Sequence, residues 1–262
     1  MTTTPSVLIT GASSGIGAVY ADRFARRGHN LVLVARDRVR LDKLADRLRR
    51  QTGVTVDVLQ ADLTDAHDLA LVEGRLHDDP EIGILINNAG MSAAGGFLTQ
   101  SVDDVTRIVN LNATALLRLA HAAAGRFAKA GEGAIVNVSS VVGLAPEYGA
   151  TVYGATKAFV LFLSQALQVE LSKLGVYVQA VLPAATRTEI WERSGKNVNQ
   201  LPAVMEVEEL VDAALAGFDR RETVTIPSLP NVEQWADLEI ARKSMIPNFN
   251  QVHAAERYGS AA

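Results

Sequence analysis

The chain has 262 residues and a formal net charge of -4, with 48% hydrophobic and 21% charged residues. This balance is typical of a globular protein with a substantial core, and the scattered basic residues give no electrostatic surface for nucleic acid. Because the chain contains no cysteine, disulfides, thiolate catalysis and thiolate metal sites are excluded. The first residues show no signal-peptide pattern and no apolar run reaches the ~18 residues of a bilayer-spanning helix. A cytoplasmic protein without a membrane partner is expected.

Short apolar segments alternate with helical patterns along most of the chain. Such alternation predicts an α/β fold with a parallel sheet covered on both faces, which explains why the strands are uninterrupted apolar runs. The chain shows no linker, so one doubly wound domain over residues 1–262 with about seven strands is expected. Strands are predicted at 6–10, 31–35, 54–61, 84–88, 134–139, 176–182 and 223–226, and helices at 15–28, 38–50, 65–78, 102–130, 151–174 and 206–218.

Two segments depart from this regularity. Residues 186–202 are polar and lack a clear period, and long connections of this kind are often lids. We therefore expect a substrate loop at about 186–205. A C-terminal extension is expected at about 227–262, and its part after Met245 shows no strong pattern, so that part is either frayed or used in assembly.

A glycine-rich turn joins the first predicted strand to the first helix, with the sequence TGASSGIG at 10–17. Its G-x-x-x-G-x-G spacing differs from the commoner G-x-G-x-x-G. Backbone N–H groups and the helix N-terminus at such a turn can hold a pyrophosphate. A structural turn with small residues for close packing is the alternative. The strand–turn–helix context favours a dinucleotide-phosphate site.

The second predicted strand ends at Ala35 and is followed by Arg36. An acidic residue there would bind the ribose 2′-hydroxyl of NAD, whereas an arginine accommodates the 2′-phosphate of NADP. Arg36 could instead be a solvated charge at a strand end, with Asp37 as the N-cap of the next helix. The pattern favours NADP(H) over NAD(H).

Two further strands end in polar residues. Asp62 and Leu63 follow the third strand, and the sequence NNAG at 87–90 closes the fourth. Each could be an ordinary turn, but both fall at carboxyl ends of parallel strands, where open α/β sheets bind ligands. The five histidines have no metal-ligand spacing, so no metal site is expected.

Tyr153 and Lys157 are four residues apart at the start of a predicted helix, so their side chains share one face. A free phenol has a pKa of about 10, and a nearby cation lowers it. Ser140 ends the preceding strand and offers a hydroxyl to a substrate oxygen. A tyrosine and a lysine at this spacing are common on ordinary helices, but their position after a strand and a small, glycine-bearing loop favours a proton-transfer site.

These motifs together resemble those of the classical short-chain dehydrogenase/reductase family, from about Val7 to about Ile226. The resemblance implies a Rossmann-type domain and a catalytic tetrad of Asn110, Ser140, Tyr153 and Lys157. Asn110 is preferred over Asn112 because it takes the asparagine position of the family's V-N-x-x-[GA] pattern. The matching segments are TGASSGIG at 10–17, ADL at 61–63, NNAG at 87–90, VNLNA at 109–113, IVNVSS at 135–140, YGATK at 153–157 and LPAATRT at 182–188.

The resemblance also implies a set of cofactor contacts. Two departures from the family pattern bear on them. The usual Pro-Gly after the sixth strand is Pro183-Ala184 here, which restricts the backbone, and Ser14 replaces a basic residue that many NADP-preferring relatives carry. The implied contacts are Gly11, Ser13, Ser14, Gly15, Ile16, Gly17, Arg36, Asp62, Leu63, Asn88, Ala89, Gly90, Tyr153, Lys157, Pro183 and Thr188.

The implied activity is NADP(H)-dependent interconversion of a carbonyl compound and an alcohol by hydride transfer, with Tyr153 as acid and base. Lys157 would lower the pKa of Tyr153 and bind the nicotinamide ribose, and Asn110 would hold a relay water. Two alternatives stay open: a non-catalytic NADP-binding regulator, and an epimerase or dehydratase on the same scaffold.

The substrate is expected to be a mostly apolar small molecule. Candidate walls of its pocket are Met91, Leu144, Tyr148 and the region of Trp191. The two long predicted helices resemble those that build homodimers and homotetramers in this family, so a homo-oligomer is expected.

Overall fold

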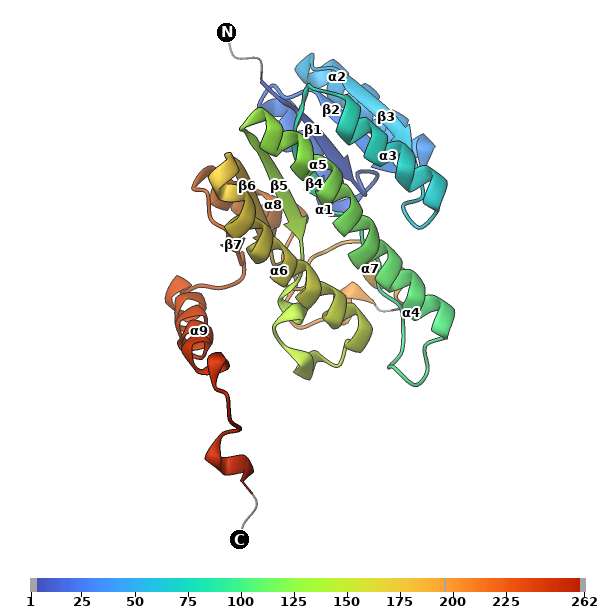
Figure 1. The fold of residues 1–262 in the computed structure, drawn as a ribbon. Coiled ribbons are helices and arrows are strands. Elements are labelled where there is room, and N and C mark those ends of the chain that lie inside the picture. The colour runs from blue at the N-terminus through green and yellow to red at the C-terminus, as the bar shows by residue number, and fades with distance from the viewer. Residues whose placement is uncertain (1–3, 196, 260–262) are drawn as a thin grey trace. The chain divides into compact units, whose positions relative to one another are not determined.

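The computed structural model describes residues 4–195 and 197–259. Contacts group the chain into two units, one ending at Pro227 and one starting at Ser228. Within the described residues, the first unit contains a seven-stranded parallel sheet with the order β3-β2-β1-β4-β5-β6-β7 (Figure 1). The strands are β1 Ser6–Thr10, β2 Leu31–Ala35, β3 Val56–Gln60, β4 Ile82–Asn87, β5 Gly133–Val138, β6 Val176–Val181 and β7 Val224–Thr225.

Helices cover both faces of this sheet. One buried cluster joins α1, α2 and α8 to strand residues such as Val7 and Leu33, and a second joins α3, α5 and α6 to alternate residues such as Leu8 and Val32. This alternation follows from the two-residue period of a strand. The helices of the first unit are α1 Gly15–Arg26, α2 Arg38–Thr52, α3 Ala66–Asp78, α4 Val102–Val109, α5 Leu116–Ala130, α6 Thr151–Leu171, α7 Ile190–Arg193 and α8 Val207–Asp219.

Shorter helical segments lie between and after these elements. A π-helical segment, Asn110–Ala115, lies between α4 and α5, and 3₁₀ turns occur at Val141–Gly143, Pro146–Tyr148, Ser172–Leu174 and Val198–Gln200. The second unit contains α9, Val232–Ser244, and 3₁₀ turns at Ile246–Asn250 and Glu256–Tyr258.

The predicted fold class is confirmed. The strands at 6–10 and 31–35 have the predicted bounds, and the others shift by at most a few residues at each end. The predicted helix at 102–130 is interrupted by the π-helical segment, and α7 and α9 were not predicted. The expectation of a single domain over residues 1–262 stays a prediction.

The order of the strands sets where a ligand can bind. The chain moves outward from β1 through β2 to β3, then returns to β4 on the other side of β1. At such a switch point the crossover helices diverge, and open α/β sheets bind ligands beyond the carboxyl ends of the strands there. We refer to the carboxyl ends of β1, β2, β4, β5 and β6 as the carboxyl edge.

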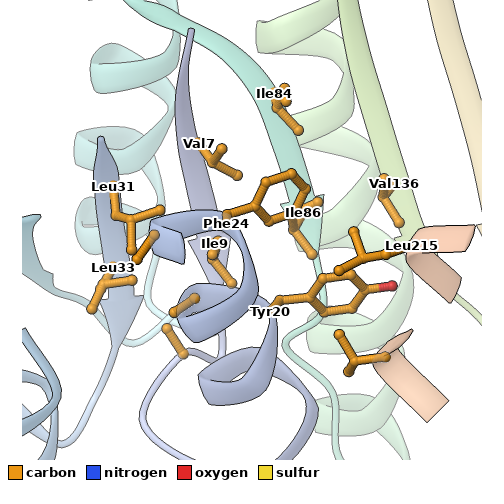
Figure 2. Close-up of a cluster of buried hydrophobic side chains, with 14 of the residues drawn as sticks. Val7, Ile9, Tyr20, Phe24, Leu31, Leu33, Ile84, Ile86, Val136 and Leu215 are labelled. Carbon is orange, nitrogen blue, oxygen red and sulfur yellow. The ribbon is translucent and has the colours of Figure 1, made fainter. Parts of the chain in front are cut away.

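Aromatic side chains of α1 hold this helix on the sheet. Tyr20 and Phe24 are almost completely buried, and their rings stack with centroids 6.2 Å apart. Figure 2 shows both rings among Val7, Ile9 and the β4 side chains. Burial of the Phe24 side chain contributes roughly 1.5–3 kcal/mol. The first turn of α1 is therefore fixed at the carboxyl edge.

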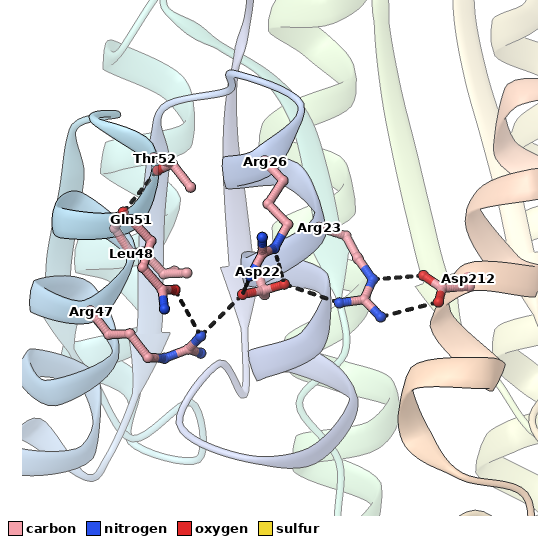
Figure 3. A network of polar contacts seen from close by, with 8 residues as sticks. All are labelled: Asp22, Arg23, Arg26, Arg47, Leu48, Gln51, Thr52 and Asp212. Atoms are coloured by element: carbon pink, nitrogen blue, oxygen red, sulfur yellow. Dashed lines mark hydrogen bonds and ion pairs between the residues drawn. The ribbon is translucent and has the colours of Figure 1, made fainter.

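A charged network joins α1 to its two neighbouring helices. Asp22 is 7% exposed and accepts hydrogen bonds from Arg26 at 2.8 Å, Arg23 at 3.0 Å and Arg47 of α2 at 3.1 Å. Arg23 also donates to Asp212 of α8 at 2.6 and 3.1 Å (Figure 3). Burial acts to raise the pKa of Asp22, but the hydrogen bonds from the three arginines outweigh it and the pKa is lowered.

We expect Asp22→Asn to lower the free energy of unfolding by about 1–3 kcal/mol at pH 7, because three arginines lose their common charged acceptor. Urea unfolding measures this difference. Because the pKa of Asp22 is lower in the folded state, its contribution is complete above about pH 4 and falls at lower pH. Asp212→Asn is the control, since that side chain is 56% exposed and should contribute less than about 1 kcal/mol. An equal deficit for Asp22→Asn at pH 7 and pH 3 would contradict this account.

Candidate active site at the carboxyl edge

Thr10, the last residue of β1, connects two of the predicted motifs. Its hydroxyl accepts hydrogen bonds from the backbone N–H groups of Asn88 at 2.9 Å and Ala89 at 3.0 Å. The side-chain amide of Asn88 in turn donates to the carbonyl oxygens of Thr10 at 2.9 Å and Gly11 at 3.3 Å. The glycine-rich turn and the residues that follow β4 are therefore one hydrogen-bonded unit.

The glycine-rich turn has the features of an anion site. Gly11 and Gly15 have φ values of 64° and 53°, which favour glycine, and a Cβ on Gly17 would collide with the carbonyl oxygen of Gly11. Ser14, the N-cap of α1, makes no side-chain capping hydrogen bond, and the first turn carries no acidic residue. The N–H groups at the start of α1 thus suit an anionic ligand such as a pyrophosphate.

Arg36 and Asp62 lie together beside this turn. Arg36 is 61% exposed and its Nη1 is 3.8 Å from Oδ2 of Asp62, so the guanidinium can turn toward a phosphate. Oδ1 of Asp62 accepts from the N–H and the hydroxyl of Thr64 at 2.9 and 2.7 Å. Burial acts to raise the pKa of Asp62, but the Thr64 hydrogen bonds and the Arg36 charge lower it overall. Leu63 is buried in the core, which leaves its backbone for contact with a ligand.

Ser140 and Tyr153 are hydrogen-bonded to each other. Ser140 follows β5 and is buried; its hydroxyl donates to the carbonyl oxygen of Pro183 at 3.2 Å and accepts from the N–H of Val142 at 3.2 Å. Tyr153 lies in the first turn of α6 and is half-buried. Burial raises the pKa of Tyr153 to about 12, and the hydrogen bond with Ser140 only partly offsets this.

Lys157 lies one turn further along α6 and is 5% exposed. Its Nζ donates to the carbonyl oxygen of Val138 at 2.8 Å and lies 5.6 Å from the centroid of the Tyr153 ring. Burial lowers the pKa of Lys157 to about 8. The predicted lowering of the Tyr153 pKa by Lys157 is not seen, because desolvation of the phenol dominates and the ammonium is turned toward Val138.

The structure does not bring Asn110 to this cluster. Asn110 is exposed, whereas Asn112 is 1% exposed and makes hydrogen bonds with the N–H and carbonyl of Met91, both at 2.9 Å. Asn112 also donates to the hydroxyl of Thr156 at 3.2 Å. Gly90 lies close to both Asn112 and Lys157: a Cβ atom at this position would be 3.4 Å from Oδ1 of Asn112 and 3.6 Å from Nζ of Lys157. The asparagine beside Lys157 is therefore Asn112, which replaces Asn110 in the candidate site.

The sequence contains a signal that favours Asn112. The buried stripe of this helical stretch runs through Ile108, Ala115 and Leu119, and Asn112 occupies the position between the first two. A polar residue within an apolar stripe is a better functional candidate than the exposed Asn110. The π-helical turn, a type frequent at functional sites, lies at this point.

The residues after β6 also reach the glycine-rich turn. Cγ2 of Thr188 lies 3.2 Å from the position of a Cβ on Gly15. Among the described residues other than glycine, Arg221 is the one with a positive φ. The φ of Ala184 is therefore not positive, and this position does not require glycine. Ala184 therefore fits the local conformation without strain. The predicted loop at 186–205 is closed at its ends by a parallel bridge between Thr186 and Met205.

The sequence model of the family described as "short chain dehydrogenase" matches residues 5–199. The chain belongs to the short-chain dehydrogenase family. The match contains the glycine-rich turn, Asn112, Ser140, Tyr153, Lys157 and Thr188 in one continuous stretch.

Solved structures of two relatives match almost the whole chain. A short-chain dehydrogenase from Sphingobium yanoikuyae, in complex with NADPH, is 65% identical with a TM-score of 0.97, covering 98% of this chain and 100% of that chain. A "bulky-bulky ketone specific alcohol dehydrogenase" from Comamonas testosteroni is 62% identical with a TM-score of 0.92, covering 98% and 99% of the two chains.

A curated relative is more distant. The very-long-chain 3-oxoacyl-CoA reductase-A of Danio rerio is 33% identical over 187 residues, which is 70% of this chain. The match spans 58% of the length of that relative. Over residues 4–195 and 197–259, no helix combines the length and hydrophobicity that crossing a membrane requires.

The two asparagines should differ in their contribution to stability. We expect Asn112→Ala to lower the free energy of unfolding by about 1–3 kcal/mol, because the hydrogen bonds of the buried Asn112 amide to Met91 and Thr156 are lost. Asn110→Ala is the matched control and should change it by less than about 0.5 kcal/mol. Thermal and urea unfolding of both variants measure the effect; equal stabilities would contradict the assignment.

The buried Lys157 should destabilise the fold at neutral pH, because its pKa is about 8 in the folded protein against an ordinary value of 10.5. Since the unfolded chain holds this proton up to higher pH, the stability that depends on Lys157 rises between pH 8 and 10. The rise amounts to on the order of 1 kcal/mol per pH unit.

Lys157→Met should therefore be at least as stable as the native protein at pH 7, and should lack this rise. Urea unfolding at pH 7, 8, 9 and 10 measures it. Lys173→Met, which removes an exposed lysine, is the control and should keep the rise. A constant stability difference between native protein and Lys157→Met over this range would disprove the prediction.

Proposed function

We propose that the protein is an NADP(H)-dependent oxidoreductase that interconverts a ketone or aldehyde and the corresponding alcohol. One observation carries the proposal: the buried Ser140 and Lys157 and the half-buried Tyr153 lie at the carboxyl edge, where the glycine-rich start of α1 also lies. The NADPH complex of the Sphingobium relative and the ketone named for the Comamonas relative support the same assignment.

The residues present fit a dinucleotide cofactor. The start of α1 has no side-chain cap, which leaves its N–H groups as donors for the pyrophosphate, and the absence of a side chain at Gly17 lets the turn pack closely. Arg36 would bind the 2′-phosphate, and Lys157 would bind ribose hydroxyls. When bound, NADPH supplies a hydride to the substrate carbon.

Tyr153 is the proton donor in the reductive direction. A phenol with a pKa of about 12 is protonated at neutral pH, so it can give its proton to the alkoxide oxygen that forms as the carbonyl is reduced. The Ser140 hydroxyl, already bonded to Tyr153, orients the same substrate oxygen. Binding at this pair places the carbonyl and the phenol within reach of each other, which supplies the proximity that the reaction needs.

Lys157 and Asn112 would return a proton to Tyr153 after each reduction. With a pKa of about 8, Lys157 can exchange a proton near neutral pH, and both its Nζ and Oδ1 of Asn112 lie close to Gly90. This arrangement supports a relay between the buried phenol and water. The role first assigned to Asn110 therefore belongs to Asn112.

The two alternatives, a regulatory NADP-binding protein and an epimerase or dehydratase, are less well supported. A purely regulatory NADP-binding protein would not need a buried lysine that lowers its stability. An epimerase or dehydratase would use the same residues but would not consume NADPH. Measuring NADPH oxidation against product formation separates these possibilities.

The substrate is an apolar ketone of substantial size. The segment between Ser140 and Tyr153 exposes Leu144 and Tyr148, which are 38% and 70% exposed. Met91 lies next to Asn112, and Trp191 belongs to the loop after β6. These side chains offer apolar surface beside the proposed proton donor. A spectrophotometric screen of ketones with one or two bulky substituents tests this substrate class.

A homo-oligomer is proposed on the exposed apolar residues of α5 and α6. Phe162 and Val169 of α6 are 73% and 76% exposed, and Phe159 and Leu117 are 40% and 41% exposed. Contact between copies through these helices would remove them from water, giving a homodimer or homotetramer. Light scattering on the purified protein measures the mass. The cytoplasmic location expected from the sequence stays a prediction.

Tyr153→Phe removes the transferable proton but keeps the ring. We expect kcat for ketone reduction to fall by about 10²–10⁴-fold, the usual contribution of a positioned general acid. NADPH affinity, measured by fluorescence titration, should stay near the native value. Tyr258→Phe provides the control, as an exposed tyrosine of the second unit. Near-native turnover in Tyr153→Phe would refute the proposed acid.

Arg36→Ala should weaken NADPH binding by roughly tenfold or more, because a charge-assisted contact with the 2′-phosphate is lost. NADH, which lacks this phosphate, should bind with unchanged affinity. Titration of both cofactors by fluorescence measures the two affinities. Arg27→Ala, at the opposite end of α1, is the control. An equal loss of affinity for NADPH and NADH would show that Arg36 does not bind the 2′-phosphate.

A further inference from the structure

An ion pair connects the loop after β6 to the second helix of the fold. Nη1 of Arg40, in the first turn of α2, lies 2.7 and 2.9 Å from the two carboxylate oxygens of Glu189. The two residues are 149 positions apart in the chain. Glu189 also accepts from Arg193 at 2.5 Å, so one carboxylate holds two guanidinium groups.

The segment Thr186–Arg193, called the strap below, is fixed at three points. At its start, Thr186 pairs with Met205, and the N–H of Arg187 donates to the Met205 carbonyl at 3.0 Å. In its middle, the methyl group of Thr188 lies against Gly15 of the glycine-rich turn. Beyond Thr188, Glu189 is held by Arg40. The strap therefore runs from the end of β6 past the proposed pyrophosphate site to α2.

Internal contacts of the strap keep it in one shape. The indole N–H of Trp191 donates to the carbonyl of Thr186 at 2.7 Å, and the N–H of Arg193 donates to the carbonyl of Glu189 at 3.1 Å. A compact segment of this kind moves as a unit. Loss of its contact with α2 would release Thr188 from the glycine-rich turn together with Glu189.

We propose that Glu189 is a positioning residue whose ion pair with Arg40 holds the strap over the bound cofactor and slows cofactor release. The proposal rests on dinucleotide binding at the glycine-rich turn. Release of the cofactor then requires the Glu189–Arg40 contact to open. Because both side chains are partly exposed, at 38% and 47%, the contact is weak enough to open during turnover.

The direction in which the cofactor release rate changes on substitution of Glu189 distinguishes a positioning role from a purely electrostatic effect of its charge. Removing a negative charge near an anionic cofactor would by itself slow its release and tighten its binding. Loss of the strap contact acts in the opposite direction. NADH is the better probe, because it lacks the 2′-phosphate of NADPH. An Arg40 side chain freed from Glu189 therefore cannot gain a new phosphate contact that would mask the effect.

The experiment measures dissociation of NADH and NADPH by stopped-flow fluorescence for native protein, Glu189→Gln, Arg40→Gln and the double variant. We expect Glu189→Gln to speed NADH release by about two- to fivefold, with the double variant no faster than Arg40→Gln alone. Arg38→Gln is the matched control, since Arg38 pairs with Asp42 on α2 and should leave the rate unchanged.

Hydrogen exchange of residues 186–193 in protein without added cofactor provides a second readout. Glu189→Gln should speed exchange in the strap while exchange in β6 stays the same. Unchanged or slower NADH release in Glu189→Gln, or additive effects in the double variant, would overturn the proposal while leaving the proposed function intact. If neither cofactor binds the native protein, the proposed function fails as well.

Discussion

The hydrogen bonds that join the ends of β1 and β4 are the constraint on which the whole site depends. Two backbone N–H groups donate to the Thr10 hydroxyl, and the Asn88 side chain returns two hydrogen bonds to the β1 end. This connection sets the glycine-rich turn against the residues after β4. From there the chain continues to Gly90, which lies close to Oδ1 of Asn112 and Nζ of Lys157, so the proposed cofactor site and the proposed proton-transfer site are fixed relative to each other.

The proposed proton-transfer residues Tyr153 and Lys157 combine burial with charge. Lys157 is almost fully buried and donates a hydrogen bond to the Val138 carbonyl, and desolvation lowers its pKa to about 8. The same burial raises the pKa of Tyr153 to about 12. Pairs of groups whose pKa values are shifted by their surroundings are frequent at catalytic sites, because catalytic acids and bases need pKa values matched to their task. The fold tolerates this arrangement because its sheet and flanking helices bury two large apolar clusters.

Much of the fold and the site could be predicted from the sequence, because both follow from local patterns. Apolar runs separated by helical periods predict a parallel sheet, and parallel strands bring Asp62, Asn88 and Ser140 to one edge. Asn112 was missed because a regular pattern gives no hint of the π-helical segment, although its place in the apolar stripe favoured it. Helix α9 was missed because none of its residues is buried in its own chain, so it has no apolar period.

Other features depend on contacts that no local pattern contains. The Glu189–Arg40 pair joins residues 149 positions apart, and neither residue belongs to a recognisable motif. The pKa of Tyr153 was predicted with the wrong sign because the i, i+4 spacing shows that two side chains share a face, but not where the ammonium points. In the structure it points to Val138, and burial decides the pKa of the phenol.

Isotope transfer tests the central claim most directly. NADPH carrying two deuterium atoms at C4 of the nicotinamide would be incubated with a bulky ketone, and the alcohol product analysed by mass spectrometry and NMR. We expect one deuterium on the carbinol carbon of each product molecule, with the hydroxyl proton drawn from solvent. Turnover without deuterium on that carbon, or no reduction of any ketone by protein that binds NADPH, would contradict it.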